Sequence, residues 1–317
     1  MNKPRRLFLS QLSLVTGAVV LNKPLTLLAS NSKNIYTACA NSHSVIIYHT
    51  NHLRGEINPV YKNMGGINNV RALLAKEEAG GLMLDGGNFL NGESSKEKQL
   101  KVIQIMNDMG YLASSPGRYE FKNGQAHLAE LLPLMKFKLV NCNYNFDESL
   151  RKLINPYLVI NTSKFKVGIT GVGPQLDGVN YNDAIQCANK VSEMLKEKEK
   201  CDLVVCISQL DYEGAHNVPG NVNLIEESEH IDMIIGDKGR KIMGGPMTFL
   251  NKLKRPLILS QAAPTGLMMA KTAFNFDEKK QHHTIEARYL VPGQPEGQLF
   301  RTSLAILRAK KELHSLS

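Results

Sequence analysis

A short apolar run that passes directly into a polar, glycine-ended segment is the feature that most constrains this chain. Residues 45–48 read VIIY and residues 49–55 read HTNHLRG. The first run is typical of a buried strand, and the second is typical of the loop that follows it. Polar side chains just past a strand are what an α/β enzyme presents at the carboxyl end of its sheet. The segment therefore predicts an α/β protein with a site built on strand ends.

The same pattern occurs three more times along the sequence. Apolar residues at 81–84, 203–207 and 231–235 run directly into polar residues at 85–88, 208–209 and 236–240. Apolar residues at helical spacing lie between these strands, over 65–75, 96–109 and 183–200. Strands that alternate with helices indicate the α/β class. We expect the four polar ends to converge on one site.

The remaining elements complete this alternating pattern. Further strands are predicted at 138–141, 166–172, 257–260, 267–270 and 272–276, with a turn at His282-His283 and helices at 125–134 and 304–313. The methionines at helical spacing in 96–109 are interpreted as core residues, because methionine fills irregular gaps between packed elements. The sequence contains no internal repeat that would suggest a second unit.

These segments resemble the motifs of the N-terminal, metallophosphoesterase (calcineurin-like phosphoesterase) domain of the 5′-nucleotidase family. That family has His-Thr-Asn-Asp-x-His-Gly and Asp-Ala-Gly-Asp at the first two strand ends. Gly-Asn-His-Glu, Ser-His-Leu and Gly-Gly-His-[Ser/Thr]-His follow. The likeness spans residues 45–276 in the same order. It implies a four-layer sandwich of two facing mixed β-sheets flanked by helices. We therefore expect one such domain over residues 41–317 and no second, nucleoside-binding domain.

The resemblance also implies a site where two divalent metals activate a water and hold a phosphate, and carboxylate, imidazole and amide ligands suit this chemistry. Arginine and lysine offer no lone pair to a metal, and an asparagine amide is neutral where a bridging carboxylate is expected. A tyrosine that titrates near about 10 is poorly suited to replace an acidic imidazolium. The matching positions of this chain hold His52, Arg54, Asn88, Arg118, Tyr119, Gln209, Lys238 and Arg240. We therefore expect no metal cofactor in this chain.

The substituted positions carry positive charge instead of metal. Arg54, Arg118, Lys238 and Arg240 bring four cations together, and each close pair repels by about 1 kcal/mol even in water. Either these side chains extend into solvent, or an anion sits among them, since arginine binds phosphate oxygens well. Asp85 is the nearest candidate for a remaining metal ligand, and the alternative is a carboxylate that caps the turn.

These considerations leave hypotheses of different classes. The first is a catalytically degenerate protein that binds a phosphate-type anion, a nucleotide or a protein partner without hydrolysis. The alternative is an active metal-dependent phosphohydrolase of the 5′-nucleotidase type, acting on nucleotides or phosphomonoesters. A third is a scaffold without any ligand. The net charge of +9 falls to 9 − 4 = +5 beyond residue 30, and no nucleic-acid-binding motif accompanies it, so a nucleic-acid partner is not expected.

The first residues have the pattern of an export signal. A basic segment, Lys3-Pro4-Arg5-Arg6, precedes an apolar stretch at 7–21. The pair Arg5-Arg6 resembles the twin-arginine motif, and the alternative is a general secretory signal. The apolar stretch is shorter than the ~20 residues of a membrane span. Residues 1–40 are therefore predicted to be an export signal and leader of a periplasmic protein that keeps no stable membrane span.

Overall fold

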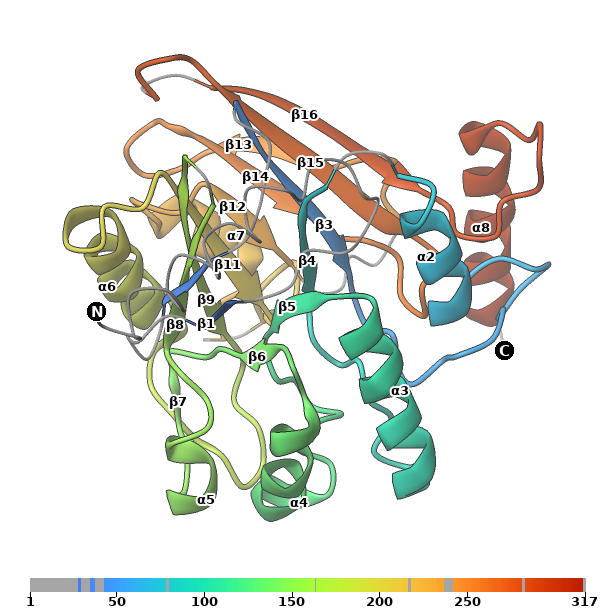
Figure 1. Cartoon of the computed structure of the whole chain (residues 1–317), viewed down its shortest axis with the longest axis horizontal. Helices are drawn as coiled ribbons and strands as arrows, with labels where there is room; N and C mark the ends of the chain where they lie inside the picture. Colours follow the sequence, from blue (N-terminus) through green and yellow to red (C-terminus); the bar gives the residue numbers. More distant parts are fainter. Residues whose placement is uncertain are drawn as a thin grey trace, which may run out of the picture.

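Two β-sheets pack face to face between helices in the computed structural model, which describes residues 28–29, 35–37, 43–77, 80–162, 164–215, 218–236, 242–280 and 283–315 (Figure 1). The first sheet has the order β16 (His283–Leu290), β15 (Met269–Phe276), β3 (Ser44–Thr50), β4 (Leu82–Asp85), β5 (Tyr111–Ser114) and β6 (Lys138–Leu139). The second has the order β1 (Leu28–Ala29), β2 (Ile35–Thr37), β8 (Tyr157–Asn161), β9 (Lys166–Val172), β11 (Leu203–Ser208), β12 (Met233–Ile235), β14 (Pro256–Ser260) and β13 (Met247–Leu250). A separate pair joins β7 (Tyr144–Asn145) to β10 (Asn180–Tyr181).

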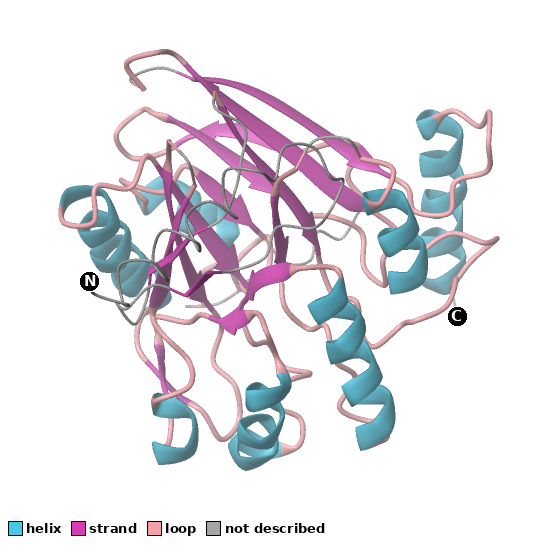
Figure 2. Ribbon diagram, viewed as in Figure 1, coloured by secondary structure: helices cyan, strands magenta, loops and turns pink. Residues whose placement is uncertain are grey.

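The helices lie outside the two sheets (Figure 2). They are α2 (Ile67–Leu74), α3 (Lys96–Asp108), α4 (Gly124–Leu131), the 3-10 turn η1 (Leu132–Leu134), α5 (Glu148–Arg151), α6 (Ala184–Glu197), α7 (Asn221–Glu227) and α8 (Phe300–Ser315). Ser95 caps α3 by accepting from the Lys98 N–H, and Asp183 caps α6 by accepting from the Gln186 N–H. The predicted four-layer α/β sandwich is confirmed.

The run VIIY is apolar throughout because strand β3 is covered on both faces. Val45 and Ile47 point between the sheets, where they join a cluster that includes Val205 and Ile207 of β11. The intervening Ile46 and Tyr48 lie in a cluster with residues of α2 and α3. Each such side chain stabilises the fold by about 1.5–3 kcal/mol when it leaves water. Burial on both sides is typical of strands in α/β sheets.

The strands that carry the polar ends run parallel within each sheet. In the first sheet β3, β4 and β5 are parallel neighbours, and in the second β9, β11, β12 and β14 are parallel neighbours. Parallel strands end at the same edge of a sheet, so the loops that follow them gather there.

Most predicted helices and strands differ from the structure by a few residues at their ends, and three differences bear on the argument. His49 and Thr50, predicted to be loop residues, belong to β3, because both pair with β4 and each has a buried side-chain hydrogen bond, His49 Nε2 with Ser260 Oγ and Thr50 Oγ1 with Asp85. The segments 267–270 and 272–276 form one strand, β15, which is paired along its length with β16. The predicted turn at His282-His283 is wrong at His283, where β16 begins, and His282 lies outside the described residues.

Within residues 1–40, the structure describes residues 28–29 and 35–37. Strands β1 and β2 fall inside the range 1–40 that the sequence assigns to a leader, and Arg5 and Arg6 lie outside the described residues. The division of the chain at residue 40 therefore stays a prediction. Within the described part, no helix combines the length and apolar character needed to cross a membrane.

Candidate functional site

The loops after β3 and β4 are joined by backbone hydrogen bonds that continue beyond the strands. The His52 N–H donates to the Gly87 carbonyl and the Arg54 N–H to the Asn88 carbonyl, both at 3.0 Å. His52, Arg54 and Asn88 all have positive φ, between 49° and 54°. This left-handed conformation is uncommon for residues with a Cβ and carries a cost of order 1 kcal/mol each. The loops therefore hold these three side chains in fixed directions.

Asp85, at the end of β4, holds the base of this loop. Its fully buried carboxylate accepts hydrogen bonds from Thr50 Oγ1 and the Gly87 N–H at 2.7 Å, and from Ser114 Oγ at 3.1 Å. Burial raises the pKa of Asp85 to about 7. The carboxylate is thus committed to the turn, as the turn-capping alternative for this residue predicts.

A second buried carboxylate, Glu120, ties the loop after β4 to the loop after β5. It accepts from the backbone N–H groups of Gly117 (2.8 Å), Leu90 (2.9 Å) and Asn88 (3.0 Å). Burial raises the pKa of Glu120 to about 7. Glu120 therefore fixes the backbone on which Asn88, Arg118 and Tyr119 are carried.

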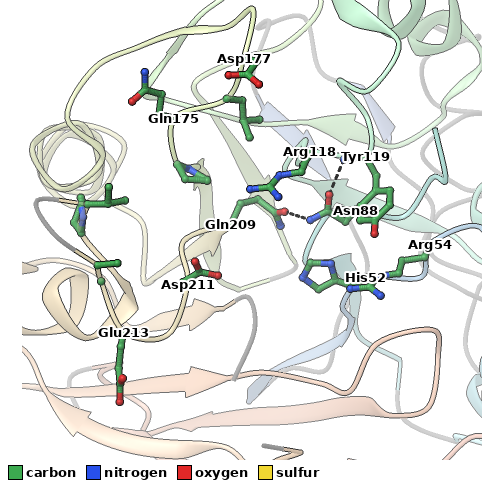
Figure 3. A pocket seen from close by; sticks show the side chains of 16 residues that line it. His52, Arg54, Asn88, Arg118, Tyr119, Gln175, Asp177, Gln209, Asp211 and Glu213 are labelled. Atoms are coloured by element: carbon green, nitrogen blue, oxygen red, sulfur yellow. Dashed lines mark hydrogen bonds between the residues drawn. The ribbon is translucent and has the colours of Figure 1, made fainter. Parts of the chain in front are cut away.

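Two amide side chains join the sheets at the centre of the site (Figure 3). Asn88 Nδ2 donates to Gln209 Oε1 at 2.5 Å, and Asn88 Oδ1 accepts from the Tyr119 N–H at 2.9 Å. Gln209 Nε2 in turn donates to the Gly86 carbonyl. A Cβ at Gly117 would lie 2.2 Å from Gln209 Oε1, so a side chain at this position would displace the amide pair. Both amides are almost fully buried and have their orientation fixed by these bonds.

A cavity of about 600 Å³ opens in front of the amide pair. Six of the eight residues predicted for the site line it, and Lys238 and Arg240 lie outside the described residues. The six are His52, Arg54, Asn88, Arg118, Tyr119 and Gln209. Three of the four predicted strand ends, at 49–55, 85–88 and 208–209, thus meet at the cavity, and residues 237–240 of the fourth lie outside the described residues. The cavity size is typical of a small-molecule site.

Positive charge in the lining comes from two arginines in different settings. Arg54 is partly buried, and its guanidinium lies 5.5 Å from the centre of the Tyr119 ring. Arg54 Nε is buried and has no hydrogen-bond acceptor among the described residues. Arg118 is exposed in the cavity. A buried N–H without an acceptor costs about 1–3 kcal/mol, so Arg54 favours a further acceptor.

Three carboxylates in the lining were missed from sequence. Asp177 lies in the loop after β9, and Asp211 and Glu213 lie in the loop after β11. Asp211 could have been predicted from the sequence, because it lies two residues beyond Gln209 in the same polar segment after the strand. The described lining carries +2 from Arg54 and Arg118 and −3 from these acids, so +2 − 3 = −1. Because Lys238 and Arg240 lie outside the described residues, the expectation of four cations at the site stays a prediction, to which these acids add negative charge.

The family's pair of divalent metals does not fit this donor set. At the matching positions the described residues offer one imidazole, two neutral amides already bonded to each other, a phenol and two guanidiniums. Nowhere in the described ranges do three or more histidine, cysteine, aspartate or glutamate residues gather so that they could hold a metal ion. Divalent metals of hydrolases need anionic or imidazole ligands in number.

Comparison with known proteins supports the fold from both sequence and structure. No family model matches the chain. It is 25% identical over 235 residues to a 5′-nucleotidase of Vibrio cholerae, covering 65% of this chain and 42% of the relative. It is 23% identical over 276 residues to the trifunctional nucleotide phosphoesterase YfkN of Bacillus subtilis, covering 74% of this chain and 18% of the relative. The chain thus spans less than half the length of these relatives.

Two solved structures share the architecture. A 5′-nucleotidase precursor from Thermus thermophilus superposes with a TM-score of 0.68 at 20% identity, covering 86% of this chain and 59% of that one. The calcineurin-like phosphoesterase YfkN from Bacillus subtilis superposes with a TM-score of 0.62 at 16% identity, covering 86% of this chain and 98% of that one. At this level of identity the structural likeness establishes the fold.

Proposed function

Because the chain belongs to the 5′-nucleotidase family and has its metallophosphoesterase fold, we propose that it is a catalytically degenerate member that binds a phosphate-type anion without hydrolysing it. The observation that carries this proposal is the Asn88–Gln209 amide pair, which joins the two sheets at two positions that the motif resemblance matches to metal ligands. The chain keeps the cavity and loses the groups that would make it hydrolytic.

Hydrolysis of a phosphate ester requires a water to be activated and the charge of the phosphate to be neutralised. In this family of folds metal ions do both, because they lower the pKa of a bound water and their positive charge offsets the negative charge of the phosphate. The amide at Asn88 cannot act as a bridging carboxylate, and the phenol of Tyr119 is not an acid suited to the leaving group at neutral pH. Among the described residues, the positions matched to the family's metal ligands can hold an anion and offer no set of ligands for a metal-activated water.

The arginines supply the affinity in this proposal. Guanidinium groups form paired, charge-assisted hydrogen bonds with phosphate oxygens. Arg54 has a buried Nε without an acceptor among the described residues, and Arg118 projects into the same cavity. An anion between them would relieve the desolvation of Arg54 and the mutual repulsion of the two charges.

Calorimetry with inorganic phosphate and with a nucleoside monophosphate tests the binding. We expect binding in the millimolar range or tighter at low salt, weakened as salt rises because the contacts are electrostatic. Arg54→Ala together with Arg118→Ala should abolish it. The matched control is Arg301→Ala, which removes an exposed arginine of α8 that does not line the cavity. Absence of binding at millimolar ligand would contradict the proposal.

Elemental analysis and turnover assays test the loss of catalysis. Purified protein is expected to hold no stoichiometric pair of zinc, manganese or iron after dialysis, and to show negligible hydrolysis of nucleoside 5′-monophosphates and of an aryl phosphate. Two metal equivalents, or turnover in the ordinary range of ~1–1000 per second that is lost on Asn88→Ala, would favour the alternative of an active metal-dependent phosphohydrolase.

We also propose that the protein acts outside the inner membrane, in the periplasm. This part rests on the signal-like sequence around Arg5 and Arg6. Changing both arginines to lysine should hold the protein in the cytoplasm, as seen by cell fractionation. Unchanged export of this variant would indicate the general secretory route instead.

A further inference from the structure

The ring of Tyr119 lies against Arg54 in the lining of the cavity, and we propose that Tyr119 is a positioning residue that holds this guanidinium ready for the anion. The inference rests on the proposed function, because it concerns how that same site binds its anion. The ring acts through Arg54 and not through a contact of its own with the ligand.

Two positions at which the chain departs from the family motifs are in contact with each other. The motif resemblance matches Arg54 to the histidine of the first strand end and Tyr119 to the histidine of Gly-Asn-His-Glu. In the folded chain the guanidinium carbon of Arg54 lies 5.5 Å from the centre of the Tyr119 ring. At this distance a cation is attracted to the face of an aromatic ring. The two substituted residues therefore form one interacting pair.

Asn88 holds the backbone of both partners. Its carbonyl accepts from the Arg54 N–H at 3.0 Å, and its side-chain Oδ1 accepts from the Tyr119 N–H at 2.9 Å. The buried Glu120 carboxylate fixes the same loops by accepting from the N–H groups of Asn88 and Gly117. Tyr119 contributes only its backbone N–H to these bonds. Replacing its side chain therefore removes the ring and leaves the hydrogen bonds in place.

The ring restrains one of the two arginines that line the cavity. Figure 3 shows Arg54 and Tyr119 together on one side of Asn88 and the exposed Arg118 on the other. The buried Nε of Arg54 has no acceptor within the described part of the chain, so no hydrogen bond to that part fixes this nitrogen. An arginine side chain loses conformational freedom when it is ordered, and ordering it before the anion arrives reduces that cost on binding.

Calorimetry with inorganic phosphate at low salt tests this role in variants of Tyr119. Tyr119→Leu removes the aromatic face, and we expect it to weaken phosphate binding about two- to fivefold, the size of a cation–π contact. Tyr119→Phe keeps the ring and should bind phosphate as the wild-type protein does. The matched control is Tyr181→Leu, which removes an exposed tyrosine of β10 that does not line the cavity.

A double-mutant cycle shows whether the ring acts through Arg54. Tyr119→Leu should weaken phosphate binding in the Arg118→Ala background and have no further effect in the Arg54→Ala background. A ring that only supported the loop, or that touched the anion itself, would weaken binding in both backgrounds. An equal loss in the two backgrounds therefore overturns the positioning role.

The side-chain Nε–H resonance of Arg54, assigned by its absence in Arg54→Lys, reports the contact without any ligand. Protons over the face of an aromatic ring are shifted upfield, so we expect an upfield signal in the wild-type protein and in Tyr119→Phe. The upfield shift should be lost in Tyr119→Leu. An unshifted signal in the wild-type protein overturns the inference, and this measurement does not depend on the folding of a Tyr119 variant.

The possible outcomes separate this inference from the proposed function. Phosphate binding that is the same in the wild-type protein and in Tyr119→Leu overturns the positioning role and leaves the proposed anion site standing. Absence of phosphate binding by the wild-type protein at millimolar ligand overturns the proposed function, and the positioning role falls with it. Weaker binding in Tyr119→Leu, confined to proteins that keep Arg54, is the expected result.

Discussion

Two sets of carboxylates lie around the same loops and differ in what surrounds them. Asp85 and Glu120 are buried behind the loops and each accepts three hydrogen bonds from the chain. Asp177, Asp211 and Glu213 stand exposed at the cavity. A buried carboxylate must have its lone pairs satisfied by the protein, whereas an exposed one is satisfied by water until a ligand arrives. Burial thus separates the residues that shape the site from those that face a ligand.

The largest expected effect on the free energy of unfolding comes from changing a buried carboxylate. Glu120→Ala leaves three backbone N–H groups without their acceptor, and each buried, unpaired donor costs about 1–3 kcal/mol. We expect the free energy of unfolding to fall by about 3–5 kcal/mol, measured by urea denaturation. A loss below about 1 kcal/mol would show that Glu120 does not hold the loops together.

A smaller effect, with a defined pH dependence, is expected at the buried His49. Its Nε2 lies 2.7 Å from Ser260 Oγ, and burial lowers its pKa from 6.5 to about 4. Folding therefore favours the neutral imidazole of His49. The contribution of His49 to the free energy of unfolding is fully present above pH 6.5 and is lost as the pH falls to about 4. The stability difference between wild type and His49→Gln should shrink by about 3 kcal/mol over that interval. Parallel curves for the two proteins in denaturation at several pH values would contradict this.

The smallest effect is expected at the exposed carboxylates, and it sharpens their comparison with the buried ones. Glu213→Gln should change the free energy of unfolding by less than about 0.5 kcal/mol, as is usual for exposed positions, while Glu120→Gln should cost clearly more. The same urea titration measures both substitutions. A loss at Glu213 as large as that at Glu120 would show that the exposed carboxylate also has a structural role.

The strands and their polar ends were predictable because apolar runs of this length have few alternatives to a buried strand. VIIY and the β11 run LVVCI both became central strands. The ends were less predictable, since His49 and Thr50 are polar and yet belong to a strand. Whether a polar residue continues a strand depends on partners far away in sequence, such as Ser260 for His49.

Six of the predicted site residues line the cavity, whereas the acidic side chains beside them were not predicted. The family resemblance singled out His52, Arg54 and Asn88, but their positive φ values follow from the meeting of two loops and have no local sequence signal. Asp177 was missed because its loop, after β9, carries none of the motifs that drew attention to the other strand ends. Only the folded arrangement shows that this loop borders the same cavity.

The mutual bonding of Asn88 and Gln209 also bears on the history of the chain. A single change of Asn88 to aspartate would set a carboxylate oxygen against Gln209 Oε1, where the amide now donates at 2.5 Å. Turning Gln209 around to supply a donor would point its oxygen at the Gly86 carbonyl. Each first step back therefore costs about 1–3 kcal/mol and gains no metal, because one ligand does not make a site. Under the proposed function, a change to a metal-dependent hydrolase would require concerted changes on loops of both sheets, so the proposed loss is expected to be effectively irreversible in evolution.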